Sequence, residues 1–264
     1  MTVWVELIYL IAAVLFIVGI KAMTRPKTAV QGNLLSAVGM LLAVVVTLLD
    51  RGIVRYEYIA AGVVAGTLAG AVLALRVRMT AMPQMVALLN GFGGGASLAL
   101  AIASQIMTLE GAGYAAGGAG MIAVLFVMAT VLVGAVTLTG SLVAFAKLQE
   151  LISGQPIGFA GMKFLNAALF ATALGATALL CLNPGNDALF WALVAITLLL
   201  GITLVLPIGG ADMPVVIALL NSYSGIAAAT SGFILENSVL IVSGSLVGAS
   251  GIILTQIMCR AMNR

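Results

Sequence analysis

The chain consists largely of apolar stretches that are each about as long as a lipid bilayer is thick. Its 264 residues are 63% hydrophobic and only 7% charged, whereas a soluble domain usually carries about 25% charged residues. Inside hydrocarbon, backbone polar groups must bond within the spanning segment, and a helix of about 20 apolar residues achieves this. The sequence therefore predicts an all-α polytopic membrane protein and excludes a soluble fold.

Nine stretches meet this length when they are divided at charges, prolines and Asn/Gly clusters. The fifth is longer than a bilayer requires and is expected to continue beyond it as a stalk. The predicted spans are residues 4–22, 32–50, 56–76, 83–106, 119–146, 163–182, 187–206, 212–234 and 238–260.

The basic residues predict the orientation of these spans. Connections on one side hold only Arg51 and Arg55, and those on the other side hold all the remaining Lys and Arg residues. Because cytoplasmic connections are enriched in Lys and Arg, the N-terminus is expected outside and the C-terminus in the cytoplasm. The residues on the cytoplasmic side are Lys21, Arg25, Lys27, Arg76, Arg78, Lys147, Lys163, Arg260 and Arg264.

Two segments share the pattern M-P-x-x-x-A-L-L-N-x-[FY]-x-G. They cover residues 82–94 and 213–225, and each opens a predicted span on the same side of the membrane. We interpret them as parts of a parallel four-helix repeat. The alternative is chance similarity between apolar helices.

Each copy of the pattern places an asparagine inside the membrane. Asn90 and Asn221 follow the first-turn proline by seven residues, which is about 10 Å along a helix. Small and hydroxyl-bearing residues continue each face. Such faces favour either close helix packing or the lining of a polar path for protons or water. The residues concerned are Gly94, Ser97, Ala101 and Ser104 in the first copy, and Ser224, Gly225, Ala228 and Ser231 in the second. Packing alone is expected for Gly62, Gly66 and Gly70, and for Gly244, Gly248 and Gly251.

Ionisable groups are scarce in the predicted spans. The chain has no histidine, no acidic or basic residue lies at the centre of a span, and Cys181 and Cys259 lack metal-site spacing. Asp212 comes nearest, and an N-cap role would suffice to explain it. Hydroxyls of Thr137, Thr139 and Ser141 could join a path, although bonding to their own helix is the commoner role. A proton route would therefore use amides, hydroxyls and water, or a group donated by another chain.

Three segments carry a family resemblance. They are Gly209 to Gly225, with its Gly-Gly-Ala-Asp-Met-Pro start, Leu240 to Gly248, and Met258 to Arg264. Together they resemble the membrane domain (domain II) of the beta subunit of proton-translocating NAD(P) transhydrogenase, and the likeness extends over essentially the whole chain.

The resemblance implies a function that spacing alone does not show. Hydride would pass between NAD(H) and NADP(H) on soluble domains, coupled to proton movement through residues 1–264. The NADP(H)-binding domain would follow residue 264, so this fragment alone is expected to bind neither nucleotide and to catalyse no hydride transfer. Expected partners are the alpha subunit or subunits, including a membrane-helix partner, and the NADP(H) domain. A homodimer in the inner membrane is also expected, with no nucleic acid and no metal.

Some site residues follow by matching positions in the family, and the others come from the polar faces, the helix 119–146 hydroxyls and the helix-end charges of the sequence itself. Asn221 matches a polar residue implicated in the proton path, and Asp212 and Arg264 match charged positions facing the NADP(H) domain. Our candidates for the path are Asn90, Asn221, Ser224, Ser97, Thr139 and Ser141. Those for cytoplasmic coupling are Asp212, Arg260 and Arg264, and those for packing of the last helix are Gly244, Gly248 and Gly251.

Asn90 departs from the family pattern, because many relatives have a histidine there. An amide does not titrate near neutral pH, whereas a histidine does. Either water held by Asn90 and Asn221 carries the proton, or a partner subunit supplies a histidine, and we favour the second. The rival functions are a free-standing secondary transporter and a structural membrane anchor.

Overall fold

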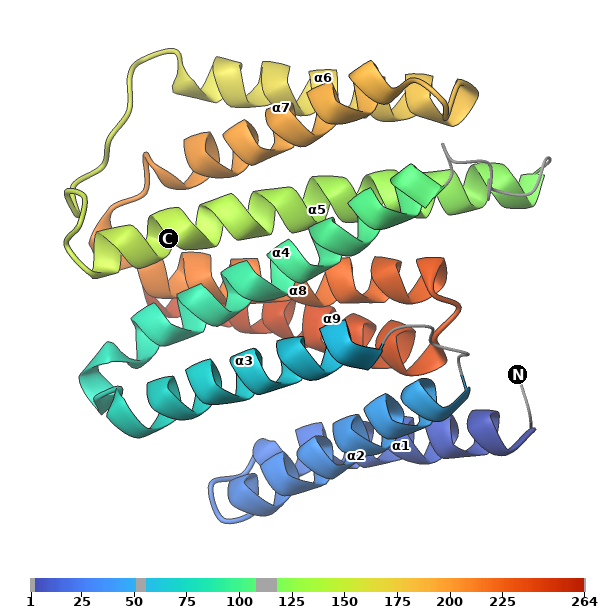
Figure 1. Ribbon diagram of the computed structural model, residues 1–264. Helices are drawn as coiled ribbons and strands as arrows, with labels where there is room; N and C mark the ends of the chain where they lie inside the picture. Colours follow the sequence, from blue (N-terminus) through green and yellow to red (C-terminus); the bar gives the residue numbers. More distant parts are fainter. Residues whose placement is uncertain (1–2, 51–55, 108–117, 264) are drawn as a thin grey trace. The chain divides into compact units, whose positions relative to one another are not determined.

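The computed structural model describes residues 3–50, 56–107 and 118–263, and these are helical apart from short connections (Figure 1). Within this described part, nine helices are long and apolar enough to cross a membrane. The all-α prediction and the nine spans are thereby confirmed, with boundaries mostly within three residues of those expected. The orientation of the termini stays a prediction.

The chain divides into two compact units, Met1–Met82 and Pro83–Arg264. The first unit contains α1 (Val3–Met23), α2 (Ala29–Asp50) and α3 (Tyr56–Arg76). Helices α1 and α2 form a hairpin, joined by the Tyr9 and Thr47 hydroxyls at 2.7 Å. A Cβ built at Gly19 would lie 2.7 Å from the Gly32 carbonyl oxygen, so these backbones approach closely because neither residue has a side chain.

Helix α3 does not show the packing expected from its glycines. No described residue of its own unit lies within 4 Å of a Cβ built at Gly62, Gly66 or Gly70, and none of its residues is buried. Spacing of small residues makes a close-packing face available, but a neighbouring helix must be present to use it.

The second unit contains six long helices. They are α4 (Met82–Met107), α5 (Gly118–Leu148), α6 (Met162–Leu182), α7 (Asp187–Val205), α8 (Met213–Ile234) and α9 (Ser238–Ala261). Helix α5 packs against α7 and α8, α6 against α7, and α8 against α9. In Figure 1, α5 accordingly runs between the α6–α7 pair and the α8–α9 pair. Its 31 residues span about 46 Å, which exceeds a hydrocarbon core of about 30 Å.

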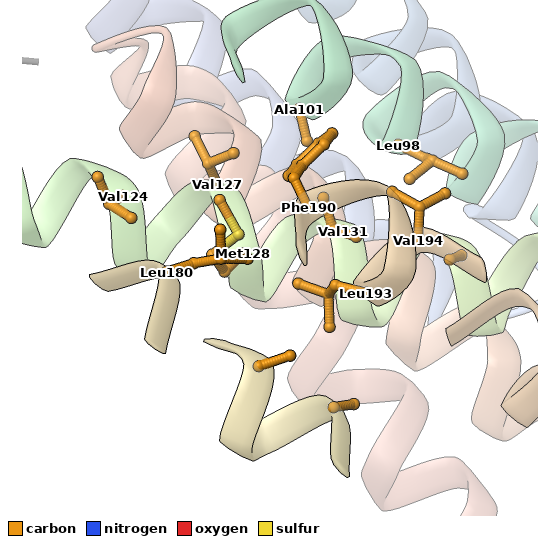
Figure 2. Packing of buried hydrophobic residues seen from close by; sticks show 13 residues of the cluster. Leu98, Ala101, Val124, Val127, Met128, Val131, Leu180, Phe190, Leu193 and Val194 are labelled. Atoms are coloured by element: carbon orange, nitrogen blue, oxygen red, sulfur yellow. The ribbon is translucent and has the colours of Figure 1, made fainter. Parts of the chain in front are cut away.

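Two apolar clusters hold this unit together. The larger gathers side chains of α4, α5, α6 and α7, with Met128, Leu180 and Phe190 almost fully buried (Figure 2). The smaller gathers side chains of α4, α5, α7 and α8 near the start of α8, around Met213 and Leu220. In the membrane, such packing supplies dispersion contacts between helices rather than removal from water.

The two copies of the repeated pattern begin with the same local structure. A single 3₁₀ turn precedes each helix, η1 (Met79–Ala81) before α4 and η3 (Gly210–Asp212) before α8. The residue before each turn is extended, with φ −73° and ψ 151° at Arg78, and φ −72° and ψ 155° at Gly209. The repeat therefore extends from sequence to backbone conformation.

Candidate proton path along α4

Helices α4 and α8 are joined by a pair of polar contacts. Asn90 is buried and donates a hydrogen bond through Nδ2 to the Ile217 carbonyl oxygen, at 3.1 Å. In return, the Ser224 hydroxyl donates to the Asn90 carbonyl oxygen, also at 3.1 Å. The sequence predicted both residues, and the structure brings them together.

Asn221, the second predicted amide, is placed differently. It is only half-buried, and none of the described residues hydrogen-bonds its side chain. The motif explains the difference, because Gly93 occupies in α4 the position that Ser224 occupies in α8. A Cβ at Gly93 would lie 3.8 Å from the Ser224 hydroxyl oxygen, so the two positions face each other and only one has a hydroxyl.

Helix α5 covers another side of Asn90. A Cβ at Gly91 would lie 3.3 Å from Cβ of Ser141, and one at Gly94 would lie 2.7 Å from Cβ of Thr137. The Ser141 hydroxyl oxygen is buried and lacks a hydrogen-bond partner among the described residues. The Thr137 hydroxyl donates to the Val133 carbonyl at 2.6 Å, so its proton is already used on its own helix. Ser141 therefore remains as the polar group of α5 at this contact.

Two glutamines extend the polar face to both ends of α4. Gln84 donates through Nε2 to the Leu148 carbonyl at 3.2 Å, and Gln105 donates to the Pro184 carbonyl at 2.7 Å. The Oε1 atoms of both are buried without a partner among the described residues. Ser97, also buried, lies between them. Along a helix, Gln84 and Gln105 are about 31 Å apart, close to the thickness of the hydrocarbon core.

Neither glutamine was predicted from the sequence. A signal was present, because amides and hydroxyls recur at roughly two-turn intervals, at Gln84, Asn90, Ser97 and Gln105. Buried polar atoms without a protein partner commonly hold ordered water. The unpartnered oxygens along α4 are therefore acceptors that water could satisfy, although no side chain among them titrates near neutral pH.

Thr139 lies away from this face. Its hydroxyl is 2.8 Å from the Leu198 carbonyl of α7 and 3.1 Å from the Ala135 carbonyl, and it packs against Gly201. The structure thus places Thr139 in the α5–α7 contact, where it links helices, and does not bring it together with Asn90.

The predicted glycines of α9 lie at the closest approach to α8. A Cβ at Gly244 would lie 2.6 Å from the Gly225 carbonyl oxygen, and one at Gly251 would lie 2.9 Å from Cα of Ser222. Gly248 accepts a 2.6 Å hydrogen bond from the Ser222 hydroxyl. Helix α8 is therefore fixed on the side that faces α9.

Helices α4, α6 and α8 begin at one side of the second unit, and α5, α7 and α9 terminate there. We name this side the Lys147 end, because a buried lysine, Lys147, holds its segments together. Lys147 is 2% exposed, and its ammonium donates to the carbonyl oxygens of Leu206, Ile208 and Gln155 at 2.6, 2.7 and 3.2 Å. The Gly210 amide adds a 2.8 Å bond to the Gly154 carbonyl. The α5–α6 connection is thereby tied to the segment that leads into α8.

Two of the candidate coupling residues, Asp212 and Arg260, lie at this same end. Asp212 is half-buried at the N-cap position of α8, but its side chain makes no capping hydrogen bond. Its backbone is helical, with φ −93° and ψ −1°, and continues from η3, whereas a capping side chain usually requires an extended residue. Arg260 is exposed in the last turn of α9, and Arg264 lies outside the described residues.

An apolar cavity of about 220 Å³ lies elsewhere in the unit, between α5, α6, α7 and α8. Its lining includes Leu132, Val136, Leu200 and Ile226, with Tyr223 at one side. Apolar cavities of this size remain dry. The polar face along α4 is therefore the better candidate for water.

Comparisons with known proteins identify the family of this chain. The family model of the NAD(P) transhydrogenase beta subunit matches residues 5–264. NAD(P) transhydrogenase subunit beta of Rhodospirillum rubrum is 42% identical over 257 residues, which cover 97% of this chain and 55% of that protein. The same figures hold for the protein of that name from one specified strain of the species. The chain thus spans about half the length of the curated relatives it matches.

These findings confirm the resemblance that the sequence predicted. With nine apolar helices in its described part, the chain is a multi-pass protein of the inner cell membrane. It belongs to the NAD(P) transhydrogenase beta-subunit family.

Proposed function

We propose that this chain is the proton-conducting membrane part of a NAD(P) transhydrogenase. In this function, hydride transfer between NAD(H) and NADP(H) takes place on soluble domains outside residues 1–264, and these domains bind both nucleotides. Proton movement through the membrane helices is coupled to that transfer. Family membership supports the assignment, and an alpha subunit is the partner that it implies.

One observation supports the position of the path. Three oxygens are buried without partners among the described residues: Oε1 of Gln84 and Oε1 of Gln105 on α4, and Oγ of Ser141 on α5, which packs against α4. Asn90 lies between the two glutamines and bridges to α8. Water molecules at these acceptors would restore their hydrogen bonds, and further water between them would complete a chain along which a proton can pass.

The titrating group would come from the partner. This chain has no histidine, and amides and hydroxyls do not change charge near neutral pH. A pump must change its proton affinity during its cycle, so we place a histidine of a membrane helix of the alpha subunit beside Asn221. The half-buried state of that amide leaves it accessible for such a contact. Two such complexes would associate as a homodimer.

Coupling would act through the Lys147 end. Asp212, Arg260 and Arg264 are charged residues close to the ends of α8 and α9, where an NADP(H)-binding domain could touch them. A change in the redox state of bound NADP(H) shifts an equilibrium between two states of the membrane helices only if the NADP(H)-binding domain then contacts those two states differently. Movement of the segment that leads into α8 would transmit that difference toward Asn221.

The test uses the full-length beta subunit assembled with its alpha subunit in proteoliposomes. NADPH reduces an NAD analogue while a trapped dye reports internal pH, in the native complex and in Asn90→Leu and Asn221→Leu. We expect both variants to lose most of the pH change, and hydride transfer to persist when an ionophore removes the proton gradient.

Asn166→Leu is the matched control. Asn166 donates to the Thr203 carbonyl of α7 at 3.2 Å, so it is also an amide that joins two helices, but it lies away from α4. Equal loss of coupling in all three variants would show that Asn90 and Asn221 act only in helix packing and not in the proton path. A native complex that is folded yet transfers no hydride would contradict the transhydrogenase assignment itself.

A further inference from the structure

The turn of the α1–α2 hairpin borders an open cleft of about 570 Å³ in the first unit. Lys21, Arg25 and Gln31 line its polar part, and Val18 and Leu35 line the part farther along the helices. The cleft thus has a cationic end beside the turn and an apolar wall that continues along the membrane-spanning segments.

The charge of this cleft is not balanced within the hairpin turn. Residues 18–35 contain three cations, Lys21, Arg25 and Lys27, and no acidic residue. Lys21 and Arg25 are exposed, so their charges are available to a ligand. Lys21 lies in the last turn of α1, where the helix dipole favours a cation. The helix dipole and the enrichment of basic residues on one side of the membrane could each explain the cations. Neither explains why the cations border a cleft with an apolar wall.

The turn is held in shape by its own hydroxyls. Thr24 donates to the Lys21 carbonyl at 2.7 Å, and Thr28 donates to the Ala22 carbonyl at 2.6 Å. Their protons are therefore used, and the side-chain donors left in the cleft are Lys21, Arg25 and Gln31. A guanidinium presents paired N–H groups that match phosphate oxygens, and an ammonium adds a second positive charge.

We propose that this cleft binds the phosphate of an anionic phospholipid. Lys21 and Arg25 contact the phosphate, the Gln31 amide donates to the headgroup, and the first part of an acyl chain lies along Val18 and Leu35. Basic pockets between membrane helices are suited to such headgroups. Free phosphate would bind the two cations equally well, but it would make no contact with the apolar wall. A phospholipid contacts both parts of the cleft, so we assign the lipid as the ligand.

The experiment measures lipid binding to the delipidated full complex in detergent by native mass spectrometry. Phosphatidylglycerol and phosphatidylcholine are titrated separately. One cation near a membrane surface contributes about fivefold to binding of an anionic lipid. We therefore expect the combined change Lys21→Gln with Arg25→Gln to weaken phosphatidylglycerol binding about thirtyfold, and to leave phosphatidylcholine binding unchanged.

Lys27→Gln is the matched control, because Lys27 belongs to the same turn but does not line the cleft. It should change phosphatidylglycerol affinity by no more than about twofold, and Lys21→Arg with Arg25→Lys should retain it. An equal loss in Lys27→Gln would show diffuse attraction by the turn and would overturn the site. Inorganic phosphate that binds as tightly as the lipid would overturn the assignment of a lipid.

Discussion

Helices α4 and α8 begin with the same sequence pattern and the same 3₁₀ turn. Hydrogen bonds from other helices nevertheless hold a different part of each. In α4 the asparagine is fixed, because Asn90 bonds to α8 and accepts from Ser224. In α8 the start of the helix is fixed, because Lys147 holds the segment that leads into it. Asn221 is half-buried, and the turn before α4 has no counterpart to Lys147 among the described residues of its own unit.

The difference shows how a duplicated pattern can perform two tasks. The matching glycines keep one role, since Gly94 packs on α5 and Gly225 packs on α9, each on the next helix in the chain. The polar residues diverge, since one amide links helices within the chain and the other remains accessible. The two copies therefore differ in that one amide is bonded within the chain and the other is half-buried without such a bond from the described residues.

The largest effect is expected from Lys147→Met, which removes the link at the start of α8. Three carbonyl oxygens lose a charged donor, and the free energy of unfolding should fall by about 2–4 kcal/mol. Hydrogen exchange should increase at residues 206–212 and stay unchanged at residues 78–82. Exposed Lys163 in the first turn of α6 provides the control: Lys163→Met should change neither the free energy of unfolding nor the exchange at these two segments. Equal exchange at the two helix starts in native protein would contradict the comparison.

A somewhat smaller effect is expected where the two copies agree. Gly94→Ala and Gly225→Ala each place a methyl group against the backbone of the next helix, and overpacking of this kind costs about 1–3 kcal/mol. Thermal unfolding of the solubilised complex should show a similar loss for both. Gly93→Ala is the control, because the nearest atom would be 3.8 Å away. A loss confined to one glycine would show that the helix pairs are not equivalent.

Much of this fold follows from local properties that the sequence contains. Span positions depend on apolar length, and the start of α8 depends on Pro214 in its first turn. Asn90 was predicted because the repeated pattern places an asparagine seven residues after a first-turn proline in each copy. These features require no knowledge of which helix lies beside which.

The remaining features depend on tertiary contacts. Gly62 and Gly244 belong to similar patterns of small residues, but only the second meets a backbone within its own unit. Lys147 resembles an ordinary cation at the end of a span, and it is buried because residues far away in sequence supply carbonyls. Gln105 is likewise buried by the α6–α7 connection, which spacing along α4 does not reveal.

The two asparagines should differ in stability when each is replaced. Asn90→Leu removes a hydrogen bond between membrane helices, which contributes about 0.6–1.7 kcal/mol. Asn221→Leu removes none made by the described residues and should change the free energy of unfolding by less than about 0.5 kcal/mol. Denaturant titration of the beta subunit without its alpha partner measures both. A larger loss for Asn221→Leu would mean that this amide already has a structural role within the chain.

The smallest effect is the most specific, because Gly93→Ser supplies the hydroxyl that α4 lacks. By the equivalence of the two copies, the introduced hydroxyl should donate to the Asn221 carbonyl as Ser224 donates to that of Asn90. The gain in stability should be about 0.6 kcal/mol, a small upward shift in Tm. If the proton path requires that Asn221 is not held by such a hydrogen bond, coupled proton transport should slow, while hydride transfer in the presence of an ionophore persists. Gly93→Ala, which adds the Cβ without the hydroxyl, should transport protons as the native complex does. Unchanged transport in Gly93→Ser, despite a higher Tm, would show that the difference between the two amides has no part in proton movement.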